Sequence, residues 1–169
     1  MAPVCSVTVI AVSAAGPGDA EAIAALLEEL DRFYGVTGPW RAGEQVRQVS
    51  EALFGSPPAA YALLAQDGFR PALAGLASYS FLWPSLGPAR SLYLKELFVP
   101  AAYRGQGVGT LLMNAVLETA ARHGCRRVEW TTDPGNTAAQ AFYARLGLPR
   151  HPKVFYRLED TGSGFRPAG

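Results

Sequence analysis

A short glycine-rich segment, Arg104–Thr110, is the part of this sequence whose residue types and spacing could do chemistry. It follows an expected strand and opens an amphipathic helix. Gly105, Gly107 and Gly109 let backbone N–H groups come close to an anion, and the helix N-terminus adds partial positive charge. Arg104 can add a charge-assisted hydrogen bond. The segment therefore predicts a site for a phosphate or pyrophosphate group.

Two common phosphate-binding motifs do not fit these residues. A P-loop has a lysine after its last glycine, whereas Gly109 is followed by Thr110 and Leu111. The dinucleotide fingerprint needs a glycine three positions after its second one, and that position is also Thr110. In addition, the segment follows the fourth expected strand rather than the first. Both motifs are therefore excluded.

A third pattern, Arg/Gln-x-x-Gly-x-Gly/Ala, is satisfied by Arg104, Gly107 and Gly109. The segment Tyr93–Val99 precedes it, and Asn136–Gly147 follows at the expected distance. On these residues the chain resembles the GNAT superfamily of acyl-CoA-dependent N-acetyltransferases. Its layout is most similar to that of the diamine (spermidine/spermine-type) N-acetyltransferases.

The resemblance implies acetyl-CoA as co-substrate and no metal. It implies that backbone amides of Gln106–Thr110 hold the coenzyme pyrophosphate, while the strand edge at Leu97–Val99 pairs with the pantetheine arm. Asn136 is expected to cap a helix and to contact the coenzyme as well. The expected coenzyme residues are Leu97, Phe98, Val99, Arg104, Gly105, Gln106, Gly107, Val108, Gly109, Thr110 and Asn136.

The resemblance makes Tyr143 the general acid that protonates the departing coenzyme A thiolate. A phenol with a reference pKa of about 10 can give a proton to a thiolate whose acid has a pKa of about 8.5. Asn136 and Tyr143 are seven residues apart and share a helix face. The alternative is that Phe142 and Tyr143 simply pack in the core.

The general base is expected near Lys95 and Glu96. The diamine acetyltransferases have consecutive acidic residues in the fourth strand, and here the first has become Lys95. Successive strand residues face opposite ways, so we expect only one of the two to face the acceptor. Glu96 is the candidate base, directly or through a water, and Lys95 would favour an acceptor that carries a carboxylate or phosphate. Alternatively, both are solvated strand charges.

Three further residues are weaker candidates for the acceptor side. Glu129 lies in the fifth expected strand, Tyr34 at the end of the first helix and Trp83 in a loop.

The elements that must position these residues follow from apolar spacing and from glycine and proline. We expect a single α/β (α+β) GNAT domain over residues 1–160 and a flexible tail over 161–169. Its mixed, mostly antiparallel sheet should be flanked by helices and splayed after the fourth strand. Strands are expected at 7–12, 61–65, 73–81, 91–99, 127–132 and 154–158, and helices at about 19–34, 43–54, 107–123 and 136–147.

Composition argues against several other classes of protein. The 169 residues carry a net charge of +1, which predicts no nucleic-acid partner. Hydrophobic residues make up 49% and charged residues 17%, enough for a core. Cys5 and Cys125 lack the spacing of a zinc site or disulfide framework. Residues 7–12 are too short to span a membrane, and no basic residue precedes Arg32, so we expect a cytoplasmic protein without membrane contact.

We therefore expect transfer of acetyl from acetyl-CoA to a primary amine of a small molecule, such as a polyamine or amino acid. Attack should be direct, in a ternary complex, with backbone N–H groups near Leu97 and Phe98 polarising the thioester carbonyl. A homodimer is expected from the resemblance alone. Alternatives are acetylation of an amino-sugar antibiotic or of a protein lysine or N-terminus, and a non-catalytic acyl-CoA sensor.

Overall fold

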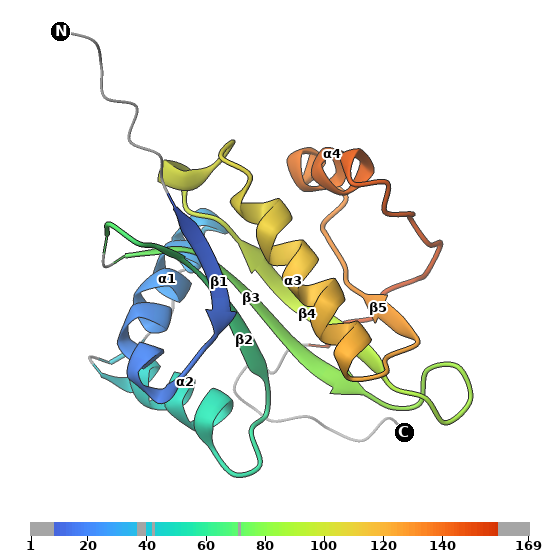
Figure 1. Ribbon diagram of the computed structural model, residues 1–169, viewed down its shortest axis with the longest axis horizontal. Coiled ribbons are helices and arrows are strands. Elements are labelled where there is room, and N and C mark those ends of the chain that lie inside the picture. Colours follow the sequence, from blue (N-terminus) through green and yellow to red (C-terminus); the bar gives the residue numbers. More distant parts are fainter. Residues whose placement is uncertain (1–8, 37–39, 42, 71, 159–169) are drawn as a thin grey trace, which may run out of the picture. The chain divides into compact units, whose positions relative to one another are not determined.

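The computed structural model describes residues 9–36, 40–41, 43–70 and 72–158. The chain forms two compact units, residues 1–131 and 132–169. Within the described residues, the first unit holds all the strands and three α-helices, and the second holds one helix (Figure 1).

The first unit is built on a five-stranded sheet in the order β1-β2-β3-β4-β5. Strands β1 to β4 are antiparallel to their neighbours, and β5 is parallel to β4. The register pairs β5 with β4 only along Ser91–Tyr93, so from Leu94 to Phe98 the described strands pair with β4 on its β3 side alone. This confirms the expected mixed sheet that opens after its fourth strand. The strands are β1 (Ile10–Ala14), β2 (Tyr61–Asp67), β3 (Leu73–Leu82), β4 (Ser91–Phe98) and β5 (Arg127–Glu129).

Helices cover both faces of this sheet (Figure 1). On one face, α2 (Glu44–Phe54) buries Val49, and α1 (Ala20–Phe33) buries residues spaced three and four apart, which form one apolar stripe. That stripe packs with Leu64, Leu76 and Phe98 of the sheet. The other face carries α3 (Val108–Arg122), whose buried residues are Val108, Leu112, Met113, Val116, Thr119 and Ala120.

Gly75 of β3 lets α3 lie close to the sheet. A Cβ atom at this position would be 2.9 Å from Leu112 Cδ1, 2.9 Å from the Phe98 carbonyl oxygen and 3.3 Å from Val108 Cγ1. Because the Phe98 carbonyl is backbone, it has little freedom to move away. A glycine here therefore sets how closely the first turns of α3 approach β3 and β4.

The second unit contains α4 (Thr137–Arg145), which begins as expected after Asn136. The strand predicted at Val154–Leu158 is wrong, because residues 151–158 form no strand in the structure. Val154 is 77% exposed and Tyr156 is 87% exposed, so these residues have the composition of a strand without a buried face. β-propensity reflects packing on neighbours and does not create a strand without them.

Other boundaries differ by a few residues. β1 runs from Ile10 to Ala14, and residues 7 and 8 of the expected first strand lie outside the described residues. β5 ends at Glu129 rather than at residue 132, since only three of its residues pair with β4. Cys5 and the predicted tail at 161–169 also lie outside the described residues, and the domain limit at residue 160 remains a prediction.

Candidate functional site

The glycine loop, defined here as Arg104–Gly107, joins the 3-10 turn η2 (Ala101–Tyr103) to α3. Gly105 has φ +75° and Gly107 has φ +82°, which lie in the left-handed region that favours glycine. Gly107 is the N-cap of α3, and all four loop residues are exposed. The first N–H groups of a helix have no partner within it, so this exposed N-terminus has the geometry that an anion needs.

Side chains brace the loop against β4 and α1. Arg104 Nε donates to the Val99 carbonyl at 3.0 Å, and its guanidinium carbon lies 4.8 Å from the centre of the Phe33 ring. Gln106 Nε2 donates to the Ala102 carbonyl at 2.8 Å. Arg104, expected as a phosphate ligand, thus also holds the loop in place. A guanidinium has several N–H donors, so this contact leaves it able to bind an anion.

The open edge of β4 contains two of the residues expected to meet the pantetheine arm. Leu97 pairs with Ala77 and Phe98 with Leu76 on the β3 side, while β5 does not extend along this part of β4. Val99 lies directly after the strand. An extended chain with amide groups can add to such an edge through main-chain hydrogen bonds.

A β-bulge in β4 changes the expectation for Lys95 and Glu96. Leu94 pairs with Tyr79 and Glu96 pairs with Ser78, so Lys95 is an extra residue in β4. Because a bulge interrupts the alternation of side chains, the argument that only one of the two can face the acceptor does not apply here. Lys95 is exposed and Glu96 is half-buried.

Glu96 can be placed on one face of the sheet from its partner. Leu76 belongs to the core under α1 and α2, and Ser78 is two residues further along the same strand. Residues two apart share a face, so Ser78 and its partner Glu96 lie on the face that α1 and α2 cover. We call this the acceptor face, because it carries Glu96, the residue expected to act on the acceptor amine.

Glu129 belongs to the same face. Tyr93 pairs with Ser80 of β3 and with Glu129 of β5, so the three form one row across the sheet. The Tyr93 hydroxyl lies 3.3 Å from Thr131 Oγ1. The sequence reasoning found Glu129 but missed Tyr93 and Thr131, because strand pairing rather than any local motif brings them together.

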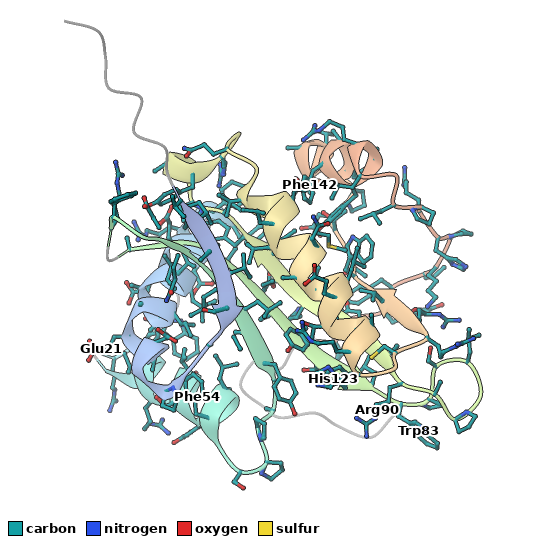
Figure 2. All side chains as sticks on the ribbon, viewed as in Figure 1. Glu21, Phe54, Trp83, Arg90, His123 and Phe142 are labelled. Atoms are coloured by element: carbon teal, nitrogen blue, oxygen red, sulfur yellow. The ribbon has the colours of Figure 1, made fainter. Side chains whose placement is uncertain are left out.

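Tyr34 and Trp83 lie at opposite ends of β4. Tyr34 follows α1 and is 50% exposed, and the preceding Phe33 ring is 6.2 Å from the ring of Phe98. Trp83 is 70% exposed and donates from Nε1 to the Pro88 carbonyl at 2.9 Å, beyond the start of β4 (Figure 2). The structure therefore does not bring these two candidates together.

In the second unit, Asn136 and Tyr143 stand at two ends of α4. Asn136 Oδ1 accepts from the Ala139 N–H at 3.0 Å, which makes it the predicted helix cap. Tyr143 is half-buried, and its ring centre is 5.1 Å from that of Phe142. Both interpretations of Tyr143, as acid and as packing residue, agree with this local geometry.

Three observations concern other possible functions. Burial raises the pKa of the Cys125 thiol, which favours its protonated form over a nucleophilic thiolate. Among the described residues, no cluster of three or more His, Cys, Asp or Glu side chains could hold a metal ion. No helix within the same residues is both long and apolar enough to cross a bilayer.

Comparison with known proteins gives consistent results. Residues 23–148 match the model of the acetyltransferase (GNAT) family. A bovine (Bos taurus) thialysine N-epsilon-acetyltransferase is 29% identical over 140 residues, which cover 77% of this chain and 78% of the relative.

Solved structures show the same fold. An integron cassette protein from V. cholerae has a TM-score of 0.80 at 25% identity, covering 90% of this chain and 94% of its own. An aminoglycoside N-acetyltransferase determined with CoA has a TM-score of 0.74 at 18% identity, covering 93% of this chain and 99% of its own. These findings confirm the resemblance noted from the glycine segment: the chain belongs to the GNAT family and is an acetyl-CoA-dependent N-acetyltransferase.

Proposed function

We propose that this enzyme moves the acetyl group of acetyl-CoA to a primary amine of a small molecule that also carries a carboxylate. Coenzyme binding is supported by one observation above all: the N-terminus of α3 is exposed. It follows two glycines in the left-handed region and lies beside the open edge of β4. Backbone amides of Gln106–Thr110 hold the pyrophosphate, and Leu97–Val99 hold the pantetheine arm. A structure of the same fold was determined in complex with CoA, which supports coenzyme binding by this chain.

Transfer proceeds by direct attack in a ternary complex. The amine nitrogen attacks the thioester carbonyl carbon, whose oxygen is polarised by N–H groups near Leu97 and Phe98. Glu96 accepts the proton that the amine loses, directly or through a water, and the C–S bond breaks. Tyr143 gives its proton to the departing thiolate. The raised pKa of Cys125 disfavours an acetyl-cysteine intermediate at that residue.

The acceptor class is inferred from Lys95 and Glu96. Lys95 is the extra residue next to Glu96 at the bulge, so one positive charge lies next to the candidate base. A polyamine with several positive charges would be repelled by Lys95, whereas a carboxylate would be attracted. The bovine relative, named for thialysine, supports an amino-acid acceptor. Glu129, Tyr34 and Trp83 remain candidates for further acceptor contacts.

The test is thiol release from acetyl-CoA over an amine panel of amino acids, thialysine, polyamines and amino sugars. We expect turnover on amino acids and a drop in kcat of about 100-fold in Tyr143→Phe, because general acid catalysis is worth at least this much. Preference for bare polyamines would contradict the role of Lys95. CoA binding without turnover on any amine would favour a protein acceptor or a sensor. A homodimer and a cytoplasmic location remain predictions.

A further inference from the structure

A buried carboxylate lies outside the site described above. Asp67, the last residue of β2, is 6% exposed and is the only charged side chain buried among the described residues. Burying a carboxylate costs free energy unless hydrogen bonds compensate, so the groups that bond to Asp67 indicate its structural role.

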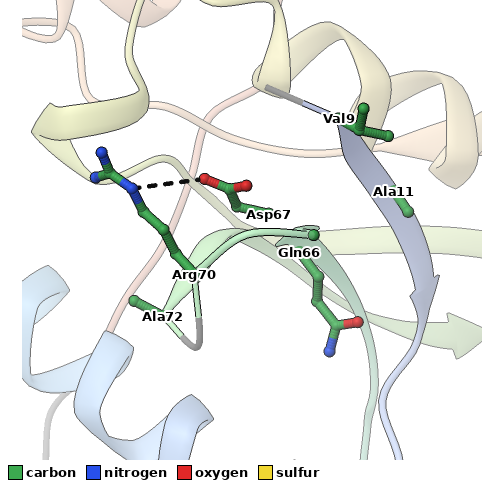
Figure 3. A pocket seen from close by; sticks show the side chains of 7 residues that line it. Val9, Ala11, Gln66, Asp67, Arg70 and Ala72 are labelled. Carbon is green, nitrogen blue, oxygen red and sulfur yellow. Dashed lines mark ion pairs between the residues drawn. The ribbon is translucent and has the colours of Figure 1, made fainter. Parts of the chain in front are cut away.

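Three groups approach the Asp67 carboxylate. Oδ1 accepts from the Phe69 N–H at 3.0 Å, and Oδ2 accepts from the Tyr103 hydroxyl at 3.3 Å. Arg70 Nε is 3.8 Å from Oδ2, but the Arg70 side chain is 67% exposed, so this ion pair is weak (Figure 3). The Phe69 bond shapes a local turn. The bond to Tyr103 spans 36 residues and links β2 to η2.

Tyr103 is the point at which η2 is attached to the rest of the fold. It is 6% exposed and is the only buried residue of η2, whereas Ala101 and Ala102 are exposed. The glycine loop begins at the next residue. The Arg104 N–H donates to the Ala101 carbonyl at 3.3 Å, and Gln106 Nε2 donates to the Ala102 carbonyl, so the loop rests on η2.

We propose that Asp67 and Tyr103 are a positioning pair that holds the glycine loop in its coenzyme-binding shape. This inference rests on the proposed function. Neither residue is assigned a contact with the coenzyme; they act through η2. A loop ordered before binding loses less conformational entropy when the pyrophosphate arrives, so coenzyme affinity depends on the pair.

The test measures CoA binding by titration calorimetry in wild-type protein and in Tyr103→Phe, which removes only the hydroxyl. We expect CoA affinity to fall three- to tenfold, the range of one lost hydrogen bond. KM for acetyl-CoA should rise by the same factor, while kcat at saturation changes less than about twofold. The matched control is Tyr79→Phe. Tyr79 is also 6% exposed, but it lies in β3 and packs against Phe81.

Hydrogen exchange separates positioning from a general loss of stability. Amides of residues 104–108 should exchange faster in Tyr103→Phe than in wild type, with no such change in Tyr79→Phe. Equal CoA affinity and equal loop exchange in wild type and Tyr103→Phe would overturn the proposal. A loss shared equally by Tyr79→Phe would also overturn it.

A double-mutant cycle tests the pair itself. Tyr103→Phe should lower CoA affinity in the wild-type background and have little effect in Asp67→Ala, or in Asp67→Asn if the alanine variant does not fold. Additive effects would overturn the pairing. Failure of the proposed function is distinguishable, because wild-type protein would then not bind CoA or would bind it without turnover on any amine.

Discussion

The two ends of the candidate site are built in different ways. At the end proposed to bind the coenzyme, backbone groups of the glycine loop and α3 lie next to two buried residues, Tyr103 and Val108. On the acceptor side, β4 is irregular: Glu96 is half-buried on the acceptor face, and the neighbouring bulge residue Lys95 is exposed.

This difference explains why the sequence predicts the coenzyme but does not identify the acceptor. Backbone N–H groups are the same whatever residue carries them, so a pyrophosphate site constrains mainly the positions that need glycine or tight packing. An acceptor site depends on side-chain charge and shape, which substitutions alter freely. Variants at each end can test whether coenzyme binding and acceptor chemistry are separable.

Glu96→Gln should lower kcat by about 100-fold or more, because the amide cannot accept the proton of the amine. CoA affinity should stay within about twofold, since the proposed pyrophosphate site is the N-terminus of α3 and not the acceptor face. Steady-state kinetics and calorimetry measure the two quantities. Glu118→Gln, an exposed change on α3, is the control. Unchanged kcat would show that Glu96 is not the base.

Gly107→Ala should weaken CoA binding about tenfold, because an alanine at φ +82° costs about 1–2 kcal/mol in the left-handed region. Amine preference should not change. Gly124→Ala is the matched control, since Gly124 also has a left-handed backbone (φ +65°) but lies just beyond the opposite end of α3. If both variants bind CoA equally, the N-terminus of α3 is not the coenzyme site.

Lys95→Glu should shift the ratio of kcat/KM for polyamines over amino acids by about fivefold towards polyamines, through reversal of one charge. The panel used for wild type measures it. Arg126→Glu changes the net charge equally at an exposed position before β5. An equal shift in both variants would mean that total charge, and not Lys95, sets the preference.

Asn136→Ala should lower the free energy of unfolding by about 1 kcal/mol through loss of the α4 cap. Chemical denaturation measures this effect, and Asn136→Asp should restore it. Calorimetry adds a second readout, because a coenzyme contact predicts weaker CoA binding even in Asn136→Asp. Equal CoA affinity in all three proteins would leave Asn136 with a capping role only.

Sequence reasoning succeeded where the signal is local. The glycines before α3, the cap at Asn136 and the apolar spacing of α1 depend on residues within a few positions of one another. The strand predicted at Val154–Leu158 is wrong because no other strand of the described residues pairs with this segment, and strand pairing depends on segments distant in the sequence.

By itself, the sequence determined the family and the local shape of the glycine loop, since glycine spacing and a helix start act through backbone geometry close in the chain. Only the tertiary structure decided that Lys95 is the extra residue of a bulge and that Glu129 shares a row with Tyr93. The hydrogen bond between the Tyr103 hydroxyl and the Asp67 carboxylate is also visible only in the tertiary structure. Each of these features depends on strand register or on contacts between residues far apart in the sequence. The local sequence around these side chains does not predict their partners.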